Sequence, residues 1–110
     1  MSDAPGPICI STDVADITLA AFDDVYGSVG FHRDPVESIP DDYLDKMFGS
    51  GTFGIFAFQN DALVGVAQIL SDDYMCAYVA ELCVHKSSQG NGVGSALMKA
   101  VNDRFSDTAL

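Results

Sequence analysis

Three glycines at alternate positions are the part of this sequence best suited to chemistry. Glycine lets a backbone curl around an anion and approach it closely. A helical pattern follows these glycines, and the first N–H groups of a helix lack acceptors within the helix and carry partial positive charge. Such a site binds phosphate without cationic side chains. The candidate phosphate-binding residues are Gln89, Gly90, Asn91, Gly92, Val93, Gly94 and Ser95.

Two apolar patterns flank the glycines and predict the elements that position them. Before the glycines, residues 78–84 are strand-like. After them, apolar residues recur every four positions, which is typical of a helix with one buried face. These residues are Val93, Leu97, Val101 and Phe105. The glycines are therefore predicted to form a strand-to-helix turn.

Two better-known phosphate loops do not fit this spacing. A P-loop requires a Gly-Lys pair, and the sequence contains none. A dinucleotide-binding turn requires Gly-x-Gly-x-x-Gly/Ala, but counting from Gly90 or Gly92 places Ser95 or Leu97 at the last position. Both classes of nucleotide-binding loop are excluded.

The rest of the chain predicts a sheet with helices packed on it. Asn60 and Asp61 separate two strand-like runs and predict a hairpin turn. Before the glycines, the predicted elements are a strand at 8–10, a helix that begins near Val14 and is ended by Gly27 and Gly30, a helix at 41–48, and strands at 52–58, 63–70 and 75–84. The predicted order is βααβββα, an α+β fold of the mixed α/β sandwich type.

The spacing Gln-x-x-Gly-x-Gly, after a strand that ends Leu82-Cys83-Val84-His85, resembles the acetyl-CoA-binding motif of the GNAT family of N-acetyltransferases. The similarity runs over residues 10–105. It implies a GNAT-like fold and an acetyl-CoA-dependent N-acetyltransferase that acts on a primary amine of a small molecule or protein. It also implies that backbone groups of Leu82, Cys83 and Val84 bind the pantetheine amides of CoA. The pyrophosphate would then lie over residues 89–95, where Asn91 and Val93 contribute backbone N–H groups.

Glu81 is the one acid within the strand-like run 75–84, and its position resembles that of the family's common general base. In that role, a carboxylate accepts the proton that an amine loses on attacking the thioester. Burying an unpaired glutamate is costly, so its place beside Leu82 and Cys83 needs a reason. The alternative interpretation is a surface glutamate on an alternating strand.

The sequence departs from the family's pattern after its last predicted helix. Family members continue with a fifth strand, a fourth helix and a further strand, whereas this sequence stops at Leu110. The part that would follow usually carries a tyrosine that protonates the leaving thiolate. We therefore expect residues 1–110 to form a single, short GNAT domain. Its strand 75–84 would have an unpaired outer edge, which predicts a homodimer.

Three functions remain open on these grounds. The first is the acetyl-CoA-dependent N-acetyltransferase. The second is a non-catalytic acyl-CoA-binding module, because the usual acid is absent. The third is a dimer-forming GNAT fragment without activity.

The formal net charge of −11 is unevenly distributed. Residues 81–110 are neutral in sum, while residues 1–80 hold thirteen acidic residues against Arg33 and Lys46. Lys86 and His85 are placed to meet phosphate. The overall acidity disfavours nucleic acid as a partner. It would attract a cationic acceptor such as an amine, or it serves only as a solvating coat.

The cysteines and the apolar runs exclude further classes of protein. An odd count of three cysteines without paired spacing argues against a disulfide framework, and we expect all three to be buried. No Cys-x-x-Cys or His-x-x-x-His pattern points to a metal. The apolar runs are too short to span a membrane, and the N-terminus lacks a signal-peptide pattern. We expect a cytoplasmic chain.

Overall fold

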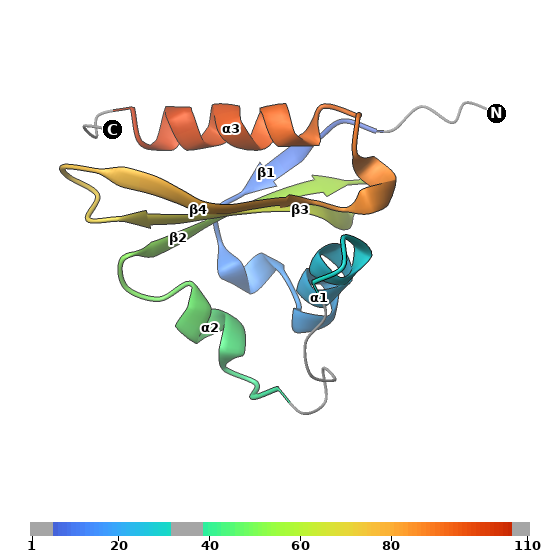
Figure 1. The fold of residues 1–110 in the computed structure, drawn as a ribbon, viewed down its shortest axis with the longest axis horizontal. Helices are drawn as coiled ribbons and strands as arrows, with labels where there is room; N and C mark the ends of the chain where they lie inside the picture. The colour runs from blue at the N-terminus through green and yellow to red at the C-terminus, as the bar shows by residue number, and fades with distance from the viewer. Residues whose placement is uncertain (1–5, 32–38, 107–110) are drawn as a thin grey trace.

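A four-stranded antiparallel sheet lies at the centre of the computed structural model, which describes residues 6–31 and 39–106 (Figure 1). The strands are arranged in sequence order, β1-β2-β3-β4. They are β1 (Cys9–Ser11), β2 (Thr52–Gln59), β3 (Ala62–Ser71) and β4 (Ala77–Val84). The helices are the 3-10 helices η1 (Val14–Asp16) and η3 (Lys86–Ser88) and the α-helices α1 (Leu19–Ser28), α2 (Tyr43–Met47) and α3 (Val93–Arg104). The predicted order βααβββα is confirmed.

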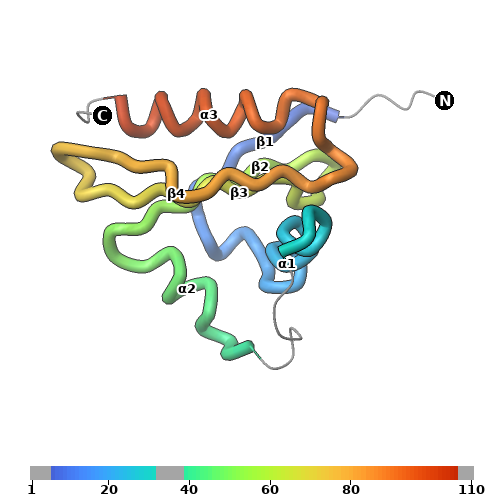
Figure 2. Tube along the Cα trace, in the orientation of Figure 1, coloured from blue at the N-terminus to red at the C-terminus, as the bar shows by residue number. Residues whose placement is uncertain are grey.

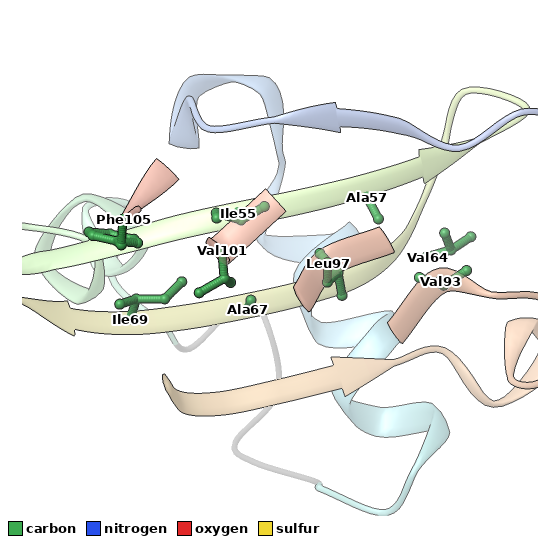
Figure 3. Packing of buried hydrophobic residues seen from close by; sticks show 9 residues of the cluster. All are labelled: Ile55, Ala57, Val64, Ala67, Ile69, Val93, Leu97, Val101 and Phe105. Carbon is green, nitrogen blue, oxygen red and sulfur yellow. The ribbon is translucent and has the colours of Figure 1, made fainter. Parts of the chain in front are cut away.

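Helices cover both faces of the sheet, so the fold has three layers. Helix α3 lies along one face, and α1 and α2 lie on the other (Figures 1 and 2). The predicted stripe of α3 packs on the sheet through nine buried residues (Figure 3), which are Ile55, Ala57, Val64, Ala67, Ile69, Val93, Leu97, Val101 and Phe105. A second buried cluster holds α1 to the opposite face and includes Phe22, Val25, Phe56, Val66 and Cys83.

The hairpin turn between β2 and β3 forms where the sequence predicts it. Asn60 and Asp61 have φ values of 52° and 66°. Two consecutive residues with positive φ are typical of the type I′ turn, whose twist matches that of the strands it connects.

The prediction for the first helix is wrong at its start and confirmed in part at its end. Residues 14–16 form the separate helix η1, and the chain is extended at Ile17 and Thr18 before α1 begins. The Thr18 hydroxyl caps α1 by accepting the N–H of Ala21 at 3.1 Å. Burial of Ile17 in the cluster beneath the sheet explains the interruption. At the other end, Gly27 lies inside α1, while Gly30, with a φ of 94°, follows the C-cap Val29 and ends the helix as predicted.

Strand β4 contains a bulge that determines which way its side chains point. Gln68 of β3 pairs with Glu81 and Ile69 pairs with Val79, so Ala80 is an extra residue with no partner opposite. Beyond the bulge the side chains alternate between faces. Cys83 belongs to the cluster between the sheet and α1, while Val84 packs against the cluster between the sheet and α3. Glu81 therefore lies on the α1 face of the sheet.

Two of the three cysteines are not buried as predicted. Cys9 and Cys76 are exposed, and only Cys83 is buried. Cys9 lies in the edge strand β1, and Cys76 lies in the turn before β4, where few neighbours cover them. Within residues 6–31 and 39–106, no helix has the length and apolar character needed to cross a bilayer.

Candidate functional site

The glycine-rich turn connects η3 to α3, as the sequence predicts. Gly90 and Gly92 have φ values of 87° and 85°, in the left-handed region that favours glycine. A Cβ atom at either position would meet no atom within 4 Å, so both glycines border open space. Gly92 is the N-cap of α3 and makes no side-chain cap hydrogen bond.

A hollow of about 460 Å³ lies over this turn. Its lining residues are Val84, Ser88, Gln89, Gly90, Gly92, Val93, Gly94 and Ser95. Ala96 N donates to Gly92 O at 3.0 Å and makes the first hydrogen bond of α3, so the N–H groups of residues 93–95 precede that helical ladder. Together with the positive end of the helix dipole, they suit a phosphate group.

The structure brings most, but not all, of the predicted phosphate-binding residues to this hollow. Asn91 is absent from its lining, and the N–H of Asn91 donates to Ser88 O at 3.3 Å within the turn. Gln89 lines the hollow and also holds the turn in place, because its Nε2 donates to Val84 O at 3.2 Å. The turn is therefore fixed to the end of β4.

The start of α3 sits directly on the backbone of β3. A Cβ atom added at Gly65 would lie 2.8 Å from Val93 Cγ1 and 2.9 Å from Leu97 Cδ1. Only glycine leaves room for this close approach. Gly65 thereby sets the position of the N–H groups that line the hollow, and no local sequence pattern identified it.

Three contacts join the end of β4 and helix η3 to α1. The thiol of Cys83 donates to Val25 O at 3.9 Å. His85 Nε2 lies 3.1 Å from Asp24 Oδ2. The N–H of Lys86 donates to the hydroxyl of Ser28 at 3.0 Å. Asp24 and Ser28 were missed in the sequence, since they lie far from the glycine-rich turn and carry no local signal.

His85 also shapes the segment that leads into the turn. Its Nδ1 accepts the backbone N–H of Ser87 at 3.1 Å, so this ring caps η3. Since Nε2 faces Asp24, the imidazole bridges α1 and η3. The segment that leads into the glycine-rich turn is therefore held in place by contacts to both α1 and η3.

Glu81 is the only acidic residue in the four strands that the structure describes. Its side chain is exposed, and Cys83 on the same face is buried. Burial, and to a smaller extent the negative charge of Glu81, raise the pKa of the Cys83 thiol. The thiol is therefore protonated near neutral pH.

The outer edge of β4 has no neighbouring strand in the described part of the chain. Alternate N–H and C=O groups of an edge strand point away from the sheet and can bind an extended ligand. Leu82, Cys83 and Val84 lie on this edge strand and lead toward the hollow, which Val84 lines. No set of three or more His, Cys, Asp or Glu side chains suited to a metal ion occurs in the described residues.

Comparison with known proteins agrees with this arrangement. A family model described as the acetyltransferase (GNAT) domain matches residues 22–110. A comparison with curated proteins finds no match. An acetyltransferase of the GNAT family from Streptococcus pneumoniae is 25% identical, with a TM-score of 0.69 over 94% of this chain and 72% of that one.

Two further solved structures share the fold. A ribosomal-protein-alanine N-acetyltransferase from Brucella melitensis is 18% identical, with a TM-score of 0.70 over 94% of this chain and 79% of that one. An aminoglycoside 6′-N-acetyltransferase complexed with coenzyme A is 16% identical, with a TM-score of 0.65 over 89% of this chain and 55% of that one. The family model covers most of the sequence, and the fold agrees with it. The chain belongs to the GNAT family of acetyltransferases.

Proposed function

We propose that this chain is an acetyl-CoA-dependent N-acetyltransferase that moves an acetyl group to a primary amine of a small molecule or protein. The observation that carries this proposal is the hollow over the uncapped start of α3, beside the open edge of β4. In the proposed complex, the CoA pyrophosphate lies over residues 89–95. The pantetheine runs along β4 and binds backbone groups of Leu82, Cys83 and Val84.

Glu81 is the proposed general base. The amine nitrogen attacks the thioester carbonyl, and its proton passes to the Glu81 carboxylate directly or through water. The C–S bond then breaks, and CoA leaves as a thiolate that takes a proton from solvent. Because Glu81 is exposed, water reaches its carboxylate and can relay the proton. The proposal takes further support from the neighbours, whose names include a ribosomal-protein-alanine and an aminoglycoside N-acetyltransferase.

Binding of CoA is tested by Gly92→Glu, which places a negative charge where the pyrophosphate should lie. We expect this variant to lose measurable CoA binding in calorimetry. Gly51→Glu is the matched control, because Gly51 has a similar φ of 81° and an added Cβ would meet only Ser71 O, at 4.0 Å. Gly51 lies just before β2 and accepts a hydrogen bond from Ser71 N at the end of β3 that is far from Gly65. The Gly51 variant therefore introduces the same strain and charge away from the start of α3. Equal CoA affinity in the two variants would refute the assignment.

The role of Glu81 is tested by Glu81→Gln with a panel of amine acceptors. We expect turnover to fall by about 10²-fold or more, the usual scale for general acid–base catalysis. The CoA affinity should barely change, because the change leaves the backbone of β4 intact. If the variant turns over at the wild-type rate, Glu81 is a surface residue and another group accepts the proton.

We further propose that two copies associate through the part of β4 that precedes the pantetheine-binding residues, so that the contact leaves room for CoA. The outer edge of β4 is open among the described residues, and Tyr78 on this strand is 65% exposed. Exposed apolar edges pair with other chains, and a twofold contact satisfies both copies at once. Light scattering at low micromolar concentration should give the mass of a dimer. A stable monomer would show that the outer edge of β4 needs no second copy to pair with, and would refute this proposal. A dimer that cannot bind CoA would favour a role in assembly alone.

A further inference from the structure

A second hollow adjoins the one over the glycine-rich turn. It has a volume of about 470 Å³ and lies where the end of α1 meets η3. Its lining residues are Ser28, Val29, Gly30, Lys86 and Gln89. Gln89 lines both hollows, so the two meet at this residue. The site described so far does not use the second hollow.

Lys86 gives this second hollow a positive charge that no acid of the described residues neutralises. Every other Lys, Arg or His side chain in that part of the chain lies within ion-pair distance of a carboxylate. Those pairs are Lys46–Asp42, His85–Asp24, Lys99–Asp103 and Arg104–Asp73. A lysine without an ion-pair partner among the described residues, in a chain of net charge −11, is available to an anionic ligand.

The surroundings of Lys86 are fixed and leave room. Its backbone N–H donates to Ser28 Oγ at 3.0 Å, and that hydroxyl donates to Val25 O at 2.7 Å. Two carbonyls near the end of α1 are already hydrogen-bonded, since Gly30 N donates to Gly27 O at 3.1 Å and Phe31 N to Tyr26 O at 3.0 Å. Gly30 has a φ of 94°, and an added Cβ would meet nothing within 4 Å. An anion in this hollow would therefore meet the lysine and the open space beside Gly30.

We propose that this second hollow receives the 3′-phosphate of CoA, with Lys86 as its cationic contact. The inference rests on the proposed use of acetyl-CoA. The pyrophosphate and the 3′-phosphate are attached to the same ribose. A pyrophosphate over the start of α3 occupies the first hollow and therefore leaves the 3′-phosphate beside it. The second hollow meets the first at Gln89, so the 3′-phosphate can reach it. A flexible lysine suits a phosphate as a point charge. Lys86 then makes the protein distinguish CoA from 3′-dephospho-CoA.

The test compares the binding of CoA and of 3′-dephospho-CoA by calorimetry. We expect the wild-type protein to bind CoA about fivefold more tightly at low ionic strength, the upper range for an exposed ion pair. This preference should shrink as salt is added. Lys86→Gln should remove it by weakening CoA binding alone, and Lys86→Arg should restore it. Lys99→Gln is the control, because Lys99 is paired with Asp103 on the exposed side of α3.

Each outcome separates this inference from the proposed function. If the wild-type protein binds both ligands equally, it binds CoA but has no 3′-phosphate contact, and the inference is overturned. If Lys86→Gln weakens both ligands to the same extent, Lys86 serves the structure, for instance by complementing the negative end of α1. If neither ligand binds, the proposed function fails and the inference fails with it.

Discussion

The contact between β3 and the start of α3 makes a sharp prediction for Gly65→Ala. The new Cβ would lie 2.8 Å from Val93 Cγ1 and 2.9 Å from Leu97 Cδ1, closer than carbon atoms pack. Both side chains are fully buried, so neither can move into solvent. The start of α3 must therefore shift away from the sheet. We expect Gly65→Ala to lower both the stability of the fold and the affinity for CoA.

Two opposing effects set the size of the loss in stability. Replacing a strand glycine by alanine restricts the unfolded chain, which stabilises the fold by about 0.5–1 kcal/mol. An extra methyl in a well-packed core costs about 1–3 kcal/mol. The cost lies in the upper part of that range here, because Val93 is β-branched and cannot easily change rotamer. The expected net loss is about 1–2 kcal/mol, or at least about 4 °C in Tm.

Urea unfolding measures this loss as a lower midpoint with an unchanged slope. Gly54→Ala is the matched control, because its Cβ would overlap Phe56 and lie 2.9 Å from Phe48, on the opposite face of the sheet. That variant should also lose stability. Its folded fraction should bind CoA as tightly as the wild type, because the start of α3 is undisturbed.

A double variant checks the physical cause. Val93→Ala removes the methyl group that Gly65→Ala would strike, so the two changes together should cost less than the sum of their separate costs. The reasoning is refuted if Gly65→Ala is as stable as the wild type. Strict additivity with Val93→Ala would equally show that the contact does not limit the approach of α3.

Three further predictions concern the turn, the thiols and the response to acid. Gly92→Ala should lower Tm, because φ 85° costs alanine about 1–2 kcal/mol. Gly94→Ala should raise Tm, because Gly94 is helical; the gain stays below the value of about 1 kcal/mol for a helix interior, since Gly94 is the second residue of α3. An alkylating reagent at neutral pH should modify the exposed Cys76 long before the buried Cys83, as mass spectrometry would show, because burial raises the pKa of the Cys83 thiol. The hydrogen-bonded guanidinium at the end of α3 lowers the pKa of Asp73, so this carboxylate stabilises the fold above about pH 4 and the effect disappears as pH falls through the lower, folded-state pKa. The urea midpoint of Asp73→Asn should therefore fall less steeply below about pH 4 than that of the wild type.

Much of the fold was predictable because its signals are local. The turn at Asn60 and Asp61 depends on those two residues, and the stripe of α3 depends on a spacing of four. The break before α1 was not predictable in this way, because burial of Ile17 beneath the sheet overrides a continuous helical pattern. The bulge at Ala80 was also missed, because the apolar residues of β4 do not show which residue pairs with which residue of β3.

In the candidate site too, features with a local sequence signal were predictable and features that depend on long-range packing were not. The glycine-rich turn was readable because positive φ values and a helix start are properties of neighbouring residues. The ion pair between Asp24 and His85, the hydrogen bond from Lys86 to Ser28 and the close approach at Gly65 join distant parts of the chain. Such contacts depend on how the layers are superimposed, which no short pattern specifies.

The uninterrupted run β2–β3–β4 has a consequence for the order of folding. Its strands are joined by the short turns at residues 60–61 and 72–76, so their pairing closes small loops and is fast. Strand β1 pairs with β2 only after the long segment that contains α1 and α2 has been enclosed. We expect substitutions at Asn60 to slow folding, and substitutions at Ile10 in β1 chiefly to accelerate unfolding. The glycine-rich turn then belongs to the half of the chain that forms early, and the α1 layer closes over the opposite face in a later kinetic step.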